Sequence, residues 1–139
     1  MQRPTERVTL PNSHISFRDV CFGYGDTEVL HQISFDAVPD GMTAIVGPSG
    51  SGKSTAARLI ASFWEADSGE AQIGGVDVRN IPLSQVMDTV AYVSQDNFLF
   101  HLSVKENIRM GKPGAEDEEI VNAAKQASCM NLSLPCQGI

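Results

Sequence analysis

This sequence of 139 residues is poor in cysteine and has no long hydrophobic run. Its cysteines are Cys21, Cys129 and Cys136, and no two of them have the C-x-x-C spacing of zinc and redox sites. We therefore expect reduced thiols, as in the cytosol, where disulfides are rare. No stretch approaches the roughly 20 apolar residues of a membrane-spanning helix. Any contact with a membrane is expected through a partner or a segment outside these residues.

Basic residues are also scarce. The chain has 10 Lys and Arg against 17 Asp and Glu, so its net charge is −7. This balance argues against a nucleic-acid partner, because phosphate backbones attract basic surfaces. At 139 residues and 42% hydrophobic composition, the chain is long enough for one globular domain and too short for two.

Glycine, lysine and serine form one highly informative motif. Gly47, Gly52, Lys53 and Ser54 satisfy the phosphate-loop pattern G-x-x-x-x-G-K-S/T. The glycines let backbone N–H groups point inward at phosphate oxygens, and the start of the following helix adds partial positive charge. The lysine reaches the β- and γ-phosphates, and the serine hydroxyl can ligate Mg²⁺.

The flanking segments supply the context that this motif requires. Met42–Val46 is a short apolar, β-branched run that predicts a buried strand. Ser54–Trp64 predicts a helix whose apolar residues cover most of its circumference, so we expect it to be largely buried. The alternative is a simple Gly/Ser turn between a strand and a helix. The motif in this context indicates a nucleoside-triphosphate-binding protein.

The remaining segments predict an α/β fold. His14–Tyr24 alternates as a strand with a bulge near Asp19, and a second strand is expected from about Gln32 to Val38. These strands form an antiparallel piece that leads into the nucleotide-binding core. The other expected elements are a hairpin over Glu70–Arg79, a helix over Leu83–Thr89, a buried strand over Val90–Ser94, a helix over Ser103–Met110 with a capping box from Ser103 to Glu106, and an amphipathic helix over Glu116–Ser128.

Taken in order, these segments resemble the N-terminal part of the nucleotide-binding domain of ABC transporters. The resemblance covers residues 14–128, with residues 1–13 as a linker or flexible lead-in and residues 129–139 unassigned. The segments that carry it are Phe22–Tyr24 (A-loop), Gly47–Thr55 (Walker A), Ser68–Asp77 (the hairpin that follows), Tyr92–Asp96 (Q-loop) and Leu99–Ile108 (start of the helical subdomain). The implied fold is an incomplete P-loop NTPase-type α/β core with an N-terminal antiparallel β piece and the start of a helical subdomain.

The resemblance also implies roles for individual residues, with ATP and Mg²⁺ as the bound cofactors. Tyr24 would stack on adenine, and Ser54 and Gln95 would ligate Mg²⁺, with Gln95 also positioning the attacking water. The phosphate-binding residues would be Gly47, Pro48, Ser49, Gly50, Ser51, Gly52, Lys53, Ser54 and Thr55. Alternatives stay open for two of them: Tyr24 can pack on the sheet, and Gln95 can be a polar strand end.

Two motifs of the family do not occur in these 139 residues. There is no Leu-Ser-Gly-Gly-Gln signature loop, and no apolar run is followed by Asp-Glu, so Walker B and its catalytic glutamate are absent. We expect a truncated domain whose isolated form has no meaningful ATP hydrolysis, although its family is one of ATPases.

Two local segments resemble those of exporters. Gln95–Phe100 and Asn107–Pro113 are similar to exporters whose ATPase is fused behind a transmembrane domain. The implied partners are a transmembrane domain, fused or separate, and a second nucleotide-binding domain, at the cytoplasmic face of a membrane. The alternatives are a nucleotide-binding fragment without turnover or another P-loop NTPase. A GTPase is disfavoured because no Asn-Lys-x-Asp motif occurs. The transported substrate cannot be read from this sequence.

Overall fold

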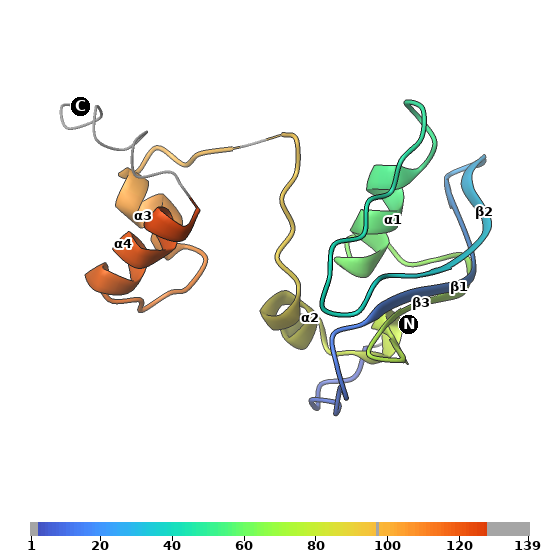
Figure 1. Ribbon diagram of the computed structural model, residues 1–139, viewed down its shortest axis with the longest axis horizontal. Coiled ribbons are helices and arrows are strands. Elements are labelled where there is room, and N and C mark those ends of the chain that lie inside the picture. Colours follow the sequence, from blue (N-terminus) through green and yellow to red (C-terminus); the bar gives the residue numbers. More distant parts are fainter. Residues whose placement is uncertain (1–2, 97, 128–139) are drawn as a thin grey trace. The chain divides into compact units, whose positions relative to one another are not determined.

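The computed structural model describes residues 3–96 and 98–127, which form a mixed α/β fold in two compact units (Figure 1). The first unit lies within residues 1–93, and the second begins at Ser94. The elements of the first unit are β1 (Ile15–Tyr24), β2 (Thr27–Asp36), α1 (Lys53–Ile60), β3 (Ser68–Ile73), β4 (Val76–Asp77), the short 3-10 helix η1 (Val78–Asn80) and α2 (Leu83–Thr89). The second unit contains α3 (Val104–Arg109) and α4 (Asp117–Gln126).

The first unit is built on a four-stranded antiparallel sheet with the order β2-β1-β3-β4. The predicted bulge near Asp19 is confirmed, because the β1–β2 register shifts between Phe17 and Val20 and Asp19 has a φ of +48°. β2 begins earlier than predicted, at Thr27, since the tight turn at Gly25 lets Thr27 pair directly with Tyr24.

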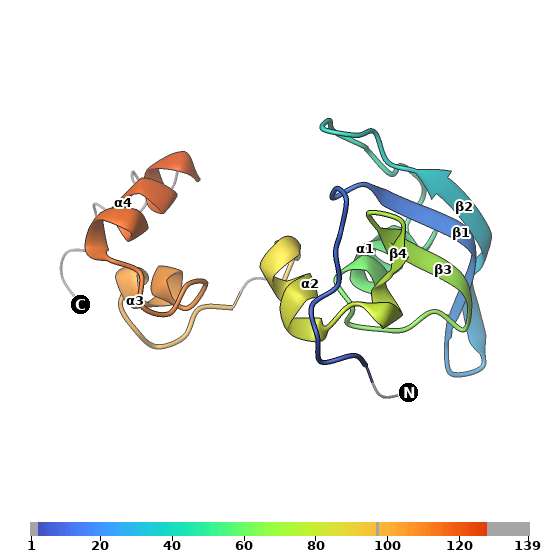
Figure 2. The same cartoon turned by 90° about the horizontal axis from the view of Figure 1, so that it is seen from below.

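Helix α1 lies against one face of this sheet and closes the core (Figure 2). The ring of Phe17 on β1 stacks on that of Phe35 on β2, with centroids 4.6 Å apart and planes 14° apart. Burial of each large apolar side chain stabilises the fold by about 1.5–3 kcal/mol. The buried core cluster comprises Phe17, Val20, Phe22, Leu30, Ala56, Leu59, Ile60, Ala71, Ile73, Val78, Ile81 and Val86.

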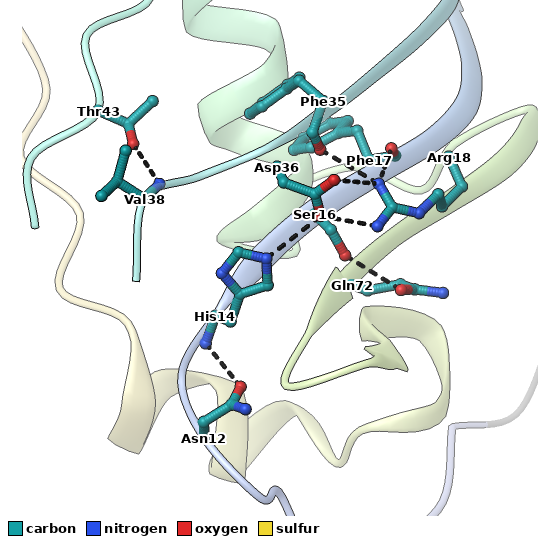
Figure 3. A network of polar contacts seen from close by, with 10 residues as sticks. All are labelled: Asn12, His14, Ser16, Phe17, Arg18, Phe35, Asp36, Val38, Thr43 and Gln72. Atoms are coloured by element: carbon teal, nitrogen blue, oxygen red, sulfur yellow. Dashed lines mark hydrogen bonds and ion pairs between the residues drawn. The ribbon is translucent and has the colours of Figure 1, made fainter. Parts of the chain in front are cut away.

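A polar network on the strands adds cross-strand bonds to this packing (Figure 3). Arg18 on β1 donates to both carboxylate oxygens of Asp36 on β2, at 2.7 and 3.1 Å, and His14 Nε2 lies 3.2 Å from the same carboxylate. The guanidinium of Arg18, and then His14, hold the pKa of Asp36 below its usual value. Ser16 donates to Gln72 of β3 at 3.1 Å, so the network joins three strands.

The turn after β2 is fixed by a side chain. The N–H of Val38 donates to Oγ1 of Thr43 at 2.8 Å (Figure 3). This bond closes the turn over residues 39–41, in which proline fixes one φ angle, and directs the chain toward the phosphate loop.

Helix α1 ends four residues before the predicted end at Trp64. Ser62 has a φ of +59°, its N–H bonds to the carbonyl of Leu59, and the N–H of Phe63 bonds to the carbonyl of Arg58. This pair of bonds is a Schellman motif, which the sequence conceals because its left-handed position usually holds glycine. The expectation that this end is buried is therefore wrong: Phe63 is 55% and Trp64 49% exposed.

The prediction of strands over Met42–Val46 and Val90–Ser94 is wrong for the described chain. Neither segment has a ladder partner among the residues that the structure describes. They flank an apolar cavity of about 250 Å³ between the sheet and α1, lined in part by Ile45 and Ala91. A strand exists only where a neighbouring backbone supplies its hydrogen bonds, and apolar sequence alone cannot provide that neighbour.

The β3–β4 hairpin and α2 are confirmed, with Pro82 at the N-cap of α2.

The structure also shows what the N-terminal lead-in contacts. The backbone N–H of Val8 donates to Gln85 Oε1 at 2.9 Å, and Gln85 Nε2 donates to the carbonyl of Val8 at 2.8 Å. Gln85 on α2 is itself buried, so this reciprocal pair attaches the polar lead-in to the first unit.

The second unit is a pair of short helices joined by ion pairs. Ser103 caps α3 by accepting from the N–H of Glu106 at 3.1 Å, but the Glu106 carboxylate pairs with Arg109, so only half of the predicted capping box forms. Arg109 also donates to Asp117 of α4 at 2.7 Å. A full capping box joins Glu116 and Glu119 at the start of α4.

The helices described here are all too short or too polar to cross a membrane. Cys21 carries a free thiol, whereas Cys129, Cys136 and the unassigned tail over residues 129–139 lie outside the described residues.

We predict that the isolated chain self-associates at micromolar concentration, because the two unpaired segments expose both backbone groups and apolar side chains. Met42 is 92% and Val93 88% exposed. Light scattering after size exclusion should show less self-association for the double variant Met42→Gln/Val93→Gln. The control Met87→Gln removes a methionine that is 68% exposed on α2 and should have little effect. A monomeric wild-type chain with a sharp two-state melt would contradict this expectation.

Candidate functional site

The phosphate-loop residues 47–52 turn the chain from the segment Met42–Val46 into α1. Gly50 and Gly52 have φ values of +81° and +85°, in the left-handed region that disfavours other residues. Gly52 is buried against β2, where an added Cβ would lie 2.5 Å from Leu30 Cδ2 and 3.3 Å from the Val29 carbonyl. The loop therefore closes onto the sheet at a position that only glycine fits.

Lys53 lies over the loop and contacts three of its oxygen atoms. Its Nζ donates to the carbonyls of Gly47 at 3.0 Å and Pro48 at 2.6 Å, and to the hydroxyl of Ser51 at 3.2 Å. These bonds hold the ammonium at the mouth of the loop, where it can donate to an anion. Charge-assisted bonds of this kind contribute about 1.5–3 kcal/mol each.

The N-terminus of α1 is uncapped. Gly52 at the N-cap provides no side-chain bond, and the first turn contains no acidic residue. The first N–H groups of a helix have no intrahelical acceptor, and they carry the positive end of the helix dipole. Ser54 is exposed in this turn and Thr55 is buried. The N–H groups and the Ser54 hydroxyl are thus available to phosphate oxygens.

Tyr24 is the last residue of β1 and lies beside the same helical turn. Its hydroxyl is 3.5 Å from Oγ1 of Thr55, and the residue is 38% exposed. The Thr55 hydroxyl, with a smaller contribution from Arg58, lowers the pKa of Tyr24 below its usual value. The structure therefore brings the predicted base-binding ring to the start of α1, 31 residues along the chain from Thr55.

Two residues near Tyr24 were not identified from the sequence. The ring of Trp64 lies 5.5 Å from that of Tyr24 at an angle of 87°. The hydroxyls of Tyr24 and then Tyr92 raise the pKa of the Arg58 guanidinium above its usual value. The sequence predicts a buried helix residue at Trp64, whereas α1 ends at Ile60 and Trp64 is 49% exposed. The one signal in the sequence is that Trp64 is the only tryptophan of the chain.

Gln95 is exposed and belongs to the second unit, whereas the loop, Ser54 and Tyr24 belong to the first. The segment that precedes Gln95 has no ladder partner among the described residues. No group of three or more His, Cys, Asp or Glu side chains with metal-ligand placement occurs among the described residues. A metal here would have to use hydroxyl, amide and phosphate oxygens, which are the ligands that Mg²⁺ accepts.

These features fit a polyphosphate that carries an aromatic base. The Lys53 ammonium and the uncapped N–H groups at the start of α1 are available to phosphates, and Tyr24 offers a partly exposed ring nearby. Gly52 closes this loop against β2, where an added Cβ would meet the Leu30 side chain and the Val29 carbonyl.

Comparison with known proteins shows similarity to ATP-binding proteins of ABC transporters. The family model described as ABC transporter matches residues 30–135. The chain is 39% identical over 133 residues to the mitochondrial iron-sulfur clusters transporter ATM1 of Kluyveromyces lactis, covering 92% of this chain and 18% of that protein. It is 44% identical over 114 residues to the mycobactin import ATP-binding/permease protein IrtA of Mycolicibacterium smegmatis, covering 81% of this chain and 13% of that protein.

Among solved structures, the chain matches a bacterial Atm1-family ABC exporter with ATP bound. The TM-score is 0.86 at 34% sequence identity, and the match covers 94% of this chain and 24% of that one. The chain thus spans about a fifth of the length of the curated relatives that it matches.

We predict that Gly52→Ala weakens both folding and binding of inorganic triphosphate more than Gly50→Ala does. Both substitutions place alanine at positive φ, which costs about 1–2 kcal/mol. Only at Gly52 does the new Cβ also meet a buried side chain, since an added Cβ at Gly50 has nothing within 4 Å. Thermal melts and calorimetry at one protein concentration measure both effects. Equal losses for the two variants would contradict the close-contact argument.

Proposed function

Because this chain belongs to the ABC transporter family, we propose that it binds ATP with Mg²⁺ at the phosphate loop as the ATP-binding part of a transporter. The observation that carries the proposal is the convergence of Lys53, the uncapped start of α1 and the half-exposed ring of Tyr24. These groups match the phosphates and the base of one nucleotide.

In this proposal the phosphates are held by the loop residues Gly47–Thr55. Lys53 exchanges its bonds to loop carbonyls for bonds to the β- and γ-phosphates. The Thr55 hydroxyl stays between Tyr24 and the α-phosphate, a role supported by its 3.5 Å contact with the Tyr24 hydroxyl. Adenine stacks on Tyr24, an interaction of about 1–3 kcal/mol by analogy with bases on aromatic side chains.

Ser54 and Gln95 would hold Mg²⁺, Ser54 through its hydroxyl and Gln95 through its amide oxygen. A metal held there would neutralise part of the negative charge on the phosphates. Ser54 supports this role because it is exposed in the first turn of α1. For Gln95 the support comes from its place in a segment that resembles the Q-loop.

The partners proposed are a transmembrane domain, fused or separate, and a second nucleotide-binding domain in an ATP-sandwich dimer, at the cytoplasmic face of a membrane. Support comes from the names of the similar proteins, which include an ABC exporter and an import ATP-binding/permease protein. Those names differ in the direction of transport. The local sequence over Gln95–Phe100 favours export.

Nucleotide affinity tests the proposed site. Lys53→Ala should weaken ATP binding by roughly tenfold to a hundredfold, the equivalent of one or two charge-assisted bonds. Tyr24→Ala should weaken ATP binding but leave inorganic triphosphate binding largely unchanged, because it removes the base contact and leaves Lys53 and the loop in place. Isothermal calorimetry with both ligands separates the two effects. Equal ATP affinity for wild type and Lys53→Ala would show that the assignment is wrong.

We also predict no meaningful steady-state ATP hydrolysis by the isolated chain. In-line attack on the γ-phosphate needs a water-orienting base and an acidic metal ligand. The 139 residues supply Lys53, Ser54 and Gln95 but neither a Walker B glutamate nor a signature loop. A phosphate-release assay should give the same rate for wild type and Lys53→Ala. Release well above that control in rigorously purified protein would overturn this prediction.

A further inference from the structure

Three aromatic rings meet beside the start of α1. The centroid of Tyr24 is 4.9 Å from that of Phe22 at 88°, and 5.5 Å from that of Trp64 at 87°. Phe22 and Trp64 also approach each other, at 6.2 Å and 48°. Tyr24 is therefore contacted edge-to-face by two rings and at its hydroxyl by Thr55.

The three contacts of Tyr24 come from different parts of the first unit. Phe22 precedes Tyr24 on β1, whereas Thr55 and Trp64 come from the two ends of the α1 region. The Schellman motif at Ser62 stops the helix and fixes the path of the chain just before Trp64. The helix whose N-terminus adjoins the phosphate loop thus also determines where Trp64 meets Tyr24.

We propose that Trp64 is a positioning residue for the base-binding ring of Tyr24, an inference that rests on the proposed function. A partly exposed tyrosine can rotate about two side-chain bonds, and stacking on a base would then require this freedom to be lost. Edge-to-face contact with Trp64 restricts the ring before the nucleotide arrives. Preorganisation of this kind strengthens binding by lowering the entropy lost on association.

The exposure of the two neighbours separates positioning from core packing. Phe22 is 3% exposed and belongs to the buried core cluster, so its removal would disturb the whole fold. Trp64 is 49% exposed and lies outside that cluster. Substitution of Trp64 should therefore change the Tyr24 ring without a comparable loss of the core.

The adjacent residue provides a matched control. Phe63 is 55% exposed and also makes an edge-to-face ring contact, but with Tyr92, at 5.0 Å and 83°. Phe63→Leu removes an aromatic ring of similar exposure from the same turn, and it leaves the Tyr24–Trp64 pair intact.

The experiment measures ATP and inorganic triphosphate affinities of the 139-residue chain by calorimetry. Trp64→Leu should weaken ATP binding by about threefold to tenfold, the size expected for loss of one aromatic pair. It should leave triphosphate binding unchanged, which also shows that the variant folds. Trp64→Phe should restore most of the ATP affinity, and Phe63→Leu should match wild type.

The alternative results are distinguishable. Unchanged ATP affinity in Trp64→Leu, with Tyr24→Ala still impaired, would overturn the inference and leave the proposed function standing. Equal weakening of ATP and triphosphate would also overturn it, by showing a structural role. Absence of ATP binding by the wild-type chain would overturn the proposed function and this inference with it.

Fluorescence gives a second measurement, because Trp64 is the only tryptophan in the chain. A base stacked on Tyr24 would lie close to the indole, so ATP should change its emission while inorganic triphosphate should not. Tyr24→Ala should abolish the change. An equal response to both ligands would contradict a role at the base.

Discussion

The contact between Gly52 and β2 is the constraint on which the site depends. Gly52 is both the N-cap of α1 and the closing residue of the phosphate loop, and it packs directly against Leu30 and the Val29 carbonyl. Leu30 belongs to the buried core. The hydrophobic packing that stabilises the sheet therefore also sets the position of the loop. The closing residue of the loop is thus fixed by the core rather than by the loop alone.

Helix α1 transmits that position to the rest of the site. Its first turn carries Lys53, Ser54 and Thr55, and its buried face carries Ala56, Leu59 and Ile60 into the core. The hydroxyl of Tyr24 contacts this first turn, although Tyr24 belongs to a strand. The sheet and the helix thus define the phosphate and ring positions together, because each packs on the same apolar cluster.

The four strands of the antiparallel sheet pair with one another through backbone hydrogen bonds. The segment that leads into the phosphate loop has no such partner among the described residues. Within the described residues, Met42–Val46 has only the Val38–Thr43 bond and apolar contacts to hold it. Unpaired backbone beside exposed apolar side chains favours association with another strand. The site is thus closely packed at Gly52 and held by fewer contacts on the side where the chain enters the loop.

The sequence by itself determined the local features whose causes are local. The G-x-x-x-x-G-K-S/T spacing, the bulge near Asp19, the β3–β4 hairpin and the Ser103 cap each depend on residues close together in the chain. Residue type and spacing are enough to predict them. The helix end at Ser62 is a local feature that was missed, because serine rarely adopts the left-handed conformation that glycine provides.

Only the tertiary structure decided which apolar segments become strands and which aromatic rings meet. Met42–Val46 and Val90–Ser94 have the composition of buried strands, but a ladder requires a partner backbone that composition does not specify. Trp64 reaches Tyr24 only because α1 ends at the Schellman motif and packs on the sheet. The phosphate loop could be predicted from the sequence because neighbouring residues build it. The surroundings of Tyr24 could not, since they are assembled from residues far apart in the chain.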